Sequence, residues 1–169
     1  MEAKINTLKR IQIPNRKIKN CAEQFKDAVK LLCSQPAGSG LVLPLITNAV
    51  FAIELYLKAL NAQVIIADNK VSAEVNCQGH SLTTLFESLD KGVKKELGFC
   101  YKKSGVFSVH AQLGAVLKKY NNLYIKARYS FERDKRISGV SLTELIKLVN
   151  FFHNFVFSLP DREYIETKT

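Results

Sequence analysis

The stretch LPLITNAVFAIELYLKAL, residues 43–60, is apolar on almost every side and decides the fold of the chain. Its apolar residues keep a helical period and also fill the other faces, and Pro44 lies where a first helical turn tolerates proline. Such a helix is either buried among other helices or spans a membrane. Asn48, Glu54 and Lys58 interrupt it, and charges at membrane depth are costly. We therefore expect the central helix of a soluble bundle, with no membrane association.

Glu54 and Lys58 need an explanation, because burial makes unpaired charges expensive. They stand four residues apart with the acid first, so they can pair on one face of a helix. Two interpretations stay open. The pair is either an intrahelical ion pair at the edge of the core or part of a polar cleft that binds a ligand.

Length and composition predict one folded domain, residues 1–169, because 169 residues with 47% hydrophobic side chains can bury a sizeable core. The polar N-terminal segment lacks the pattern of a signal peptide. Four cysteines are scattered without a CxxC pair, which is typical of reduced thiols rather than of a zinc site. The prediction is a cytoplasmic protein with no metal and no cofactor.

Basic residues are unevenly distributed along the chain, which carries a net charge of +10. Two basic segments, residues 1–30 and 91–136, flank a neutral-to-acidic centre. This pattern favours RNA or nucleotide phosphate as the partner. An acidic protein partner and a surface whose charge serves only solubility are the alternatives.

Hydrophobic periodicity predicts an all-α protein, a five-helix antiparallel bundle over residues 15–158. The main helical segments are residues 15–33, 43–60, 82–89, 106–127 and 142–159. Residues 62–78 are expected to form a short hairpin or an irregular insertion, and residues 1–13 and 161–169 loose termini. Ser141 and Glu144 have the spacing of a capping box at the start of the last helix. That helix carries more phenylalanines than one core-facing stripe needs, which favours a homodimer interface.

Common enzyme motifs are absent from the sequence: it has no P-loop, GxGxxG, GxSxG or HExxH, and no carboxylate cluster of a two-metal site. Of the three histidines, His110 and His153 fall on apolar helical faces, where packing is the expected role. His80 follows a glycine at a helix start, where it can cap the helix or act as a neutral donor or acceptor.

Three segments, AIELYLKAL (52–60), GHSLTTLFESL (79–89) and YIKARYSFE (124–132), follow one another in the sequence. Their order and spacing resemble the HEPN superfamily of prokaryotic helical proteins, in particular its branch with an ELxLKA, GHxLxxLF and RYxxE pattern. The resemblance covers roughly residues 15–158. It implies a helical bundle that is usually a homodimer and often belongs to a toxin–antitoxin, abortive-infection or other phage-defence system.

Many members of that superfamily are metal-independent endoribonucleases, whose site is an arginine followed four to six residues later by a histidine. No arginine of this chain has a histidine at that spacing. The closest approach is Lys147 with His153, a weak catalytic candidate because lysine lacks the planar fork of arginine. Five polar residues match the branch motifs and form the predicted ligand-binding set: Glu54, Lys58, His80, Arg128 and Glu132. The alternative for this set is a buried polar network that fixes helix register.

The sequence therefore predicts a HEPN-like protein that binds RNA or nucleotide, without robust catalysis. Two alternatives stay open. One is a metal-independent endoribonuclease with a degenerate site, built from Lys147 and His153 or from Arg128 and His80. The other is a dimeric protein–protein interaction module that binds a cognate protein partner.

Overall fold

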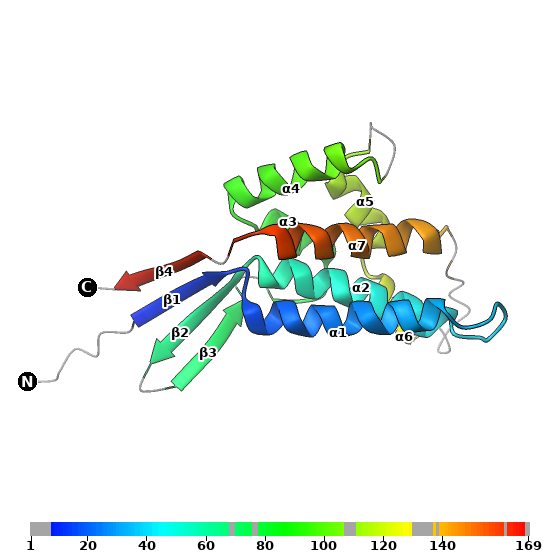
Figure 1. The fold of residues 1–169 in the computed structure, drawn as a ribbon, viewed down its shortest axis with the longest axis horizontal. Coiled ribbons are helices and arrows are strands. Elements are labelled where there is room, and N and C mark those ends of the chain that lie inside the picture. Colours follow the sequence, from blue (N-terminus) through cyan, green and yellow to red (C-terminus); the bar gives the residue numbers. More distant parts are fainter. Residues whose placement is uncertain are drawn as a thin grey trace, which may run out of the picture.

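A computed structural model describes residues 8–67, 70–75, 78–106, 111–129, 137, 139–160 and 162–167. Within these residues the chain forms seven helices and four strands (Figure 1). In chain order they are β1 (Leu8–Ile13), α1 (Arg16–Cys33), α2 (Val42–Ala59), β2 (Ala62–Ala67), β3 (Lys70–Val75), α3 (Leu82–Glu87), α4 (Lys91–Ser104), α5 (Leu113–Tyr120), α6 (Leu123–Arg128), α7 (Leu142–Ser158) and β4 (Arg162–Thr167). The mainly helical content of the predicted all-α protein is confirmed, but the described residues form seven helices instead of five and include a sheet.

The central helix is α2, as its sequence predicts. It packs against α1, α3, α6 and α7, and Ile53, Tyr56 and Leu57 have no exposed surface. The helix is also long and apolar enough to cross a membrane, but 56% of Val42–Ala59 is buried inside the fold. This burial is typical of a core helix, as expected for a helix interrupted by Asn48, Glu54 and Lys58.

Two helices differ from the prediction. Residues 106–127 were expected to form one helix, but the described part is divided into α5 and α6, because Asn122 adopts a left-handed backbone with φ of 59°. None of the main helical segments predicted from the sequence covers residues 91–104, yet these residues form the complete helix α4. The Asp90 side chain caps its start and Gly105, with φ of 62°, ends it.

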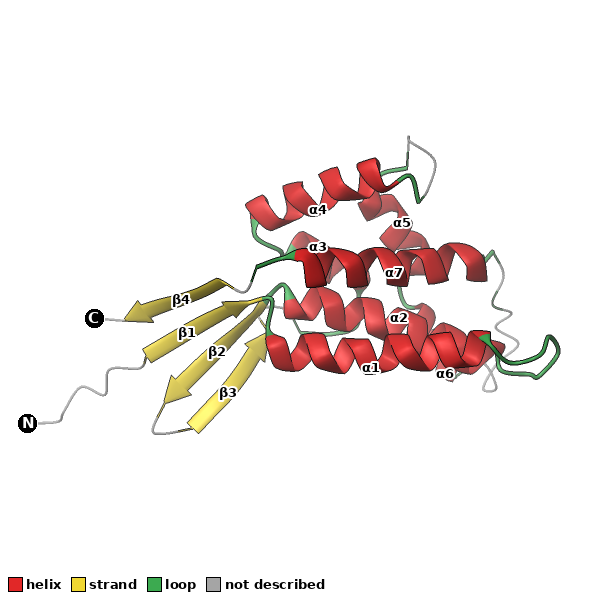
Figure 2. Cartoon of the chain, in the orientation of Figure 1, coloured by secondary structure: helices red, strands yellow, loops and turns green. Residues whose placement is uncertain are grey.

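A four-stranded antiparallel sheet extends from one end of the helices, in the order β3-β2-β1-β4 (Figure 2). Of the two alternatives predicted for residues 62–78, a hairpin or an irregular insertion, the structure has the hairpin, formed by β2 and β3. The prediction of loose termini is wrong for residues 8–13 and 162–167, which pair with each other as β1 and β4. The partner strands are separated by almost the whole chain, so local sequence patterns could not reveal the pairing.

A polar contact joins the last helix to α5. The Ser141 hydroxyl accepts a hydrogen bond from the Glu144 N–H, which is the first of the two bonds of the predicted capping box. The Glu144 carboxylate accepts from Lys119 Nζ at 2.7 Å and from the Tyr120 hydroxyl at 3.0 Å. These bonds, that from Lys119 first, lower the pKa of Glu144. Burial, followed by the bond to Glu144, raises the pKa of Tyr120.

Three of the predicted thiols, those of Cys21, Cys33 and Cys100, are free. Cys77 and His110 lie outside the described residues.

Candidate functional site

A buried carboxylate lies at the centre of the candidate site. Glu54 of α2 has no exposed surface, although its side chain ends in a carboxyl group. Its Oε1 atom lies 2.6 Å from Lys58 Nζ, one helical turn further along α2. The intrahelical ion pair predicted from the spacing of these two residues is therefore present. It places the lysine charge on the buried acid rather than leaving it for a ligand.

His80 binds the same carboxylate from a different element. It directly precedes Ser81, whose side chain caps α3 by accepting a hydrogen bond from the Thr84 N–H. The cap fixes the backbone at the start of α3, and His80 Nδ1 lies 3.1 Å from each oxygen of Glu54. An ionised carboxylate can only accept, so Nδ1 carries the hydrogen of this contact and Nε2 is the ring nitrogen left for a ligand. The His80 side chain is 49% exposed, which gives a ligand access to it.

An aromatic ring connects His80 to an arginine. Tyr124 of α6 stacks on the His80 ring at a centroid distance of 5.5 Å and on Phe51 of α2 at 5.4 Å. The Tyr124 hydroxyl accepts a hydrogen bond of 2.8 Å from Arg128 Nη1. The guanidinium of Arg128 also lies over the rings of Tyr124 and Tyr129, at 5.2 Å and 5.6 Å from their centroids. Arg128 itself is exposed, so its charge is held in place while it remains open to solvent.

The structure thus connects four of the five residues predicted to bind ligand. Glu54 holds Lys58 and His80 directly, and Arg128 joins them through Tyr124. The fifth residue, Glu132, lies outside the described residues. Sequence analysis missed Tyr124 as a member of the site, because it falls on an apolar stripe. Its spacing of four residues from Arg128 could have identified it, because this spacing places the two side chains on one helical face.

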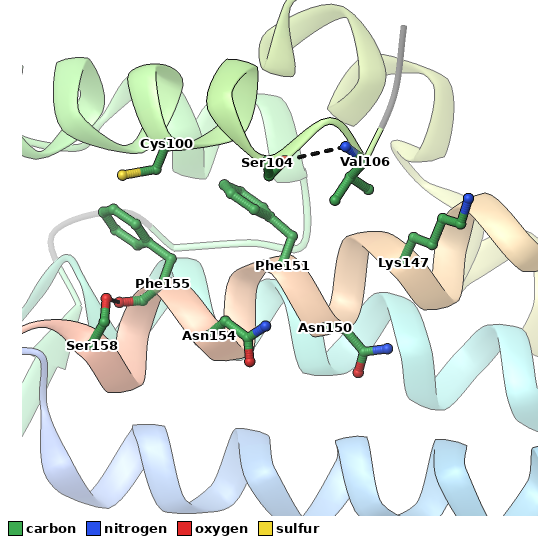
Figure 3. Close-up of a pocket in the computed structure, with 9 residues that line it drawn as sticks. All are labelled: Cys100, Ser104, Val106, Lys147, Asn150, Phe151, Asn154, Phe155 and Ser158. Carbon is green, nitrogen blue, oxygen red and sulfur yellow. Dashed lines mark hydrogen bonds between the residues drawn. The ribbon is translucent and has the colours of Figure 1, made fainter.

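Lys147 and His153, the weak catalytic candidates, do not come together within one chain. Lys147 lines a pocket of about 520 Å³ between α4 and α7, where Phe151 and Phe155 point toward α4 (Figure 3). His153 Nδ1 instead shares a hydrogen bond of 3.2 Å with the Tyr56 hydroxyl and lies 3.9 Å from Glu23 of α1. The six-residue spacing rotates the two side chains to different sides of the helix. Within a single chain, Lys147 and His153 therefore contact different surroundings, Lys147 at the pocket beside α4 and His153 at Tyr56 and Glu23.

Burial, followed by the charge of Lys26, lowers the pKa of His153. The nearby carboxylates of Glu23 and Asp27 act in the opposite direction and do not outweigh these effects. His153 is therefore a neutral histidine packed between helices near neutral pH, as its apolar surroundings in the sequence predict.

Among the described residues, no group of three or more His, Cys, Asp or Glu side chains is placed to hold a metal ion. The chemistry that the site does offer is of two kinds. A half-exposed imidazole anchored to a carboxylate can accept or donate a proton at Nε2. A fixed, exposed guanidinium can bind a phosphate oxygen.

Comparison of the chain with protein-family models, with curated proteins and with solved structures gives no match.

Proposed function

We propose that the chain is a HEPN-like RNA- or nucleotide-binding protein whose ligand phosphate binds beside Arg128 and His80. The observation that carries this proposal is the series of contacts from buried Glu54 through His80 and Tyr124 to exposed Arg128. The resemblance of the three sequence segments to HEPN proteins adds a setting in a defence or toxin–antitoxin system, and a homodimer as the working form.

Phosphate is the ligand that best fits this arrangement. A guanidinium has five N–H donors, and one of those of Arg128 is used by the Tyr124 hydroxyl. The stacked tyrosines hold its plane, so little conformational freedom is lost when the remaining donors bind an oxyanion. The overall charge of +10 attracts a polyanion toward the surface that carries the site.

A purely structural role explains the pair of Glu54 and Lys58, but it does not explain the exposed positions of His80 and Arg128. Glu54 and Lys58 satisfy each other's charge as an intrahelical pair within α2, and this pair needs no other residue. That role does not require an exposed arginine or a half-exposed histidine. The two solvent-accessible groups, His80 and Arg128, are the ones that a ligand needs.

Binding of a labelled single-stranded RNA of mixed sequence, measured by fluorescence anisotropy, tests the proposal. We expect Arg128→Gln to weaken binding about tenfold, since it removes a charge-assisted hydrogen bond. Lys126→Gln is the matched control, because Lys126 is exposed on the same helix and the variant loses the same charge. An equal loss of affinity in both variants would show that only net charge matters and would contradict the site.

A second function, metal-independent RNA cleavage, is favoured by one specific observation. The contact between Glu54 and His80 Nδ1 orients the ring so that Nε2 can take the proton of a ribose 2′-hydroxyl, while Arg128 holds the phosphate. Incubation of RNA with the protein in EDTA checks this. Cleavage that is lost in His80→Gln and kept in His153→Gln would establish it, and intact RNA with wild-type protein would leave binding alone.

A further inference from the structure

We infer that α4 carries a second binding surface, on which a base of single-stranded nucleic acid stacks on Phe99 while phosphates lie near Lys95, Lys102 and Lys103. This surface goes beyond the proposed site, with which it shares no residue. In Figure 1, α4 and α6 lie at opposite edges of the helical part of the molecule.

The packing of α4 leaves Phe99 on the solvent side. Leu97 and Tyr101 are buried, and the Tyr101 ring meets Phe151 of α7 edge to face at 5.3 Å. These residues fix the helix on the bundle. Phe99, two residues from each of them along the helix, is 65% exposed. An aromatic ring of this exposure on an ordered helix is available to stack on a flat partner.

Lysines predominate among the charged neighbours of this ring, which also include Glu96, three residues before Phe99. α4 has five lysines and one glutamate, Glu96. Lys95 lies four residues before Phe99, and Lys102 and Lys103 lie three and four residues after it, so all three are its neighbours on the helix. Each of the three is exposed. Lys94 differs, because its Nζ is bound to Glu87 at 2.7 Å.

Charge and shape together favour single-stranded nucleic acid over other polyanions. An acidic protein would use the lysines but has no particular need for a flat, exposed ring. A membrane would need a wide apolar face, and the apolar residues of α4 are turned inward, which leaves Phe99 alone outside. A duplex hides its base faces. An unpaired base offers a flat face between two phosphates, and both RNA and DNA single strands present it.

The chain has no tryptophan, so Phe99→Trp places a single fluorescent reporter on this surface. We expect addition of a ten-residue oligouridylate or oligothymidylate to quench its emission, because a stacked base lies against the indole. Leu31→Trp is the control, since Leu31 of α1 is 67% exposed but lies outside α4, and its emission should stay unchanged. Inorganic polyphosphate supplies the charge without bases and should quench neither variant.

Affinity measurements complete the test. We expect Phe99→Ala to weaken oligouridylate binding about tenfold and Phe99→Tyr to keep it, because a single base–aromatic stack is worth that much. Quenching of Phe99→Trp should persist when Arg128→Gln is added, which separates this surface from the first site. Equal quenching by polyphosphate, no quenching by either oligonucleotide, or a blue shift seen only with phosphatidylserine vesicles would each overturn the inference.

Discussion

His80 Nδ1 lies 3.1 Å from both carboxylate oxygens of Glu54, a residue that is fully buried in the central helix. The acid therefore fixes the orientation of a histidine whose side chain is half exposed. Because Lys58 balances the same carboxylate, the site contains a buried negative charge with two basic partners. We therefore expect substitution of Glu54 to affect both the stability of the fold and the proposed binding.

We expect Glu54→Gln to lower the free energy of unfolding by about 3 kcal/mol, because it leaves Lys58 without its charge partner at a mostly buried position. Urea denaturation measures this change. Glu87→Gln is the control, since Glu87 pairs with Lys94 near the surface and is 66% exposed. Its loss should cost less than about 1 kcal/mol. Equal effects of the two substitutions would show that the buried pair has no special role.

Removal of the Ser141 hydroxyl tests the cap of the last helix. Ser141→Ala should lower the free energy of unfolding by about 1 kcal/mol, because the Glu144 N–H loses its acceptor. Thermal unfolding of this variant is compared with Thr143→Ala, a change on the exposed side of the same first turn. If Thr143→Ala were as destabilising as Ser141→Ala, the cap would not explain the start of α7.

Acid should destabilise the protein through His153. Its pKa is lowered in the folded chain, so the unfolded chain binds the proton first as the pH falls below about 6.5. The free energy of unfolding therefore decreases between that value and the lower pKa of the folded state. We expect His153→Gln to flatten this part of the pH dependence in urea denaturation from pH about 7.5 to about 5. An unchanged slope would contradict a neutral, partly buried role for His153.

Local patterns predicted the elements whose side chains repeat with a helical period. The helices predicted at residues 15–33 and 142–159 match α1 and α7 to within a residue or two, and the central helix and the pairing of Glu54 with Lys58 are as expected. These features depend on residues close together in sequence. The placement of His80 at the start of a helix is also local, because Gly79 and Ser81 mark it.

Features that depend on distant residues or on a single backbone angle were missed. The pairing of β1 with β4 joins the two ends of the described chain. Asn122 divides a continuous apolar stripe through one left-handed residue. The helix α4 was missed because its sequence is rich in lysine and its apolar face is narrow, with only Leu97 and Tyr101 buried. The contact of His80 with Glu54 depends on the packing of α3 against α2. The order of the motifs suggested that the two residues lie close together, but it could not give the distance or orientation of the contact.

The central proposal is that a ligand phosphate binds beside His80 and Arg128, and histidine NMR tests it most directly. The chain has only three histidines, so a long-range ¹H–¹⁵N spectrum can follow each ring nitrogen during titration with single-stranded RNA. We predict that the Nε2 signal of His80 shifts on RNA binding, that the signals of His153 do not, and that Arg128→Gln removes the shift. Binding of RNA with an unchanged His80 signal would contradict the proposed site.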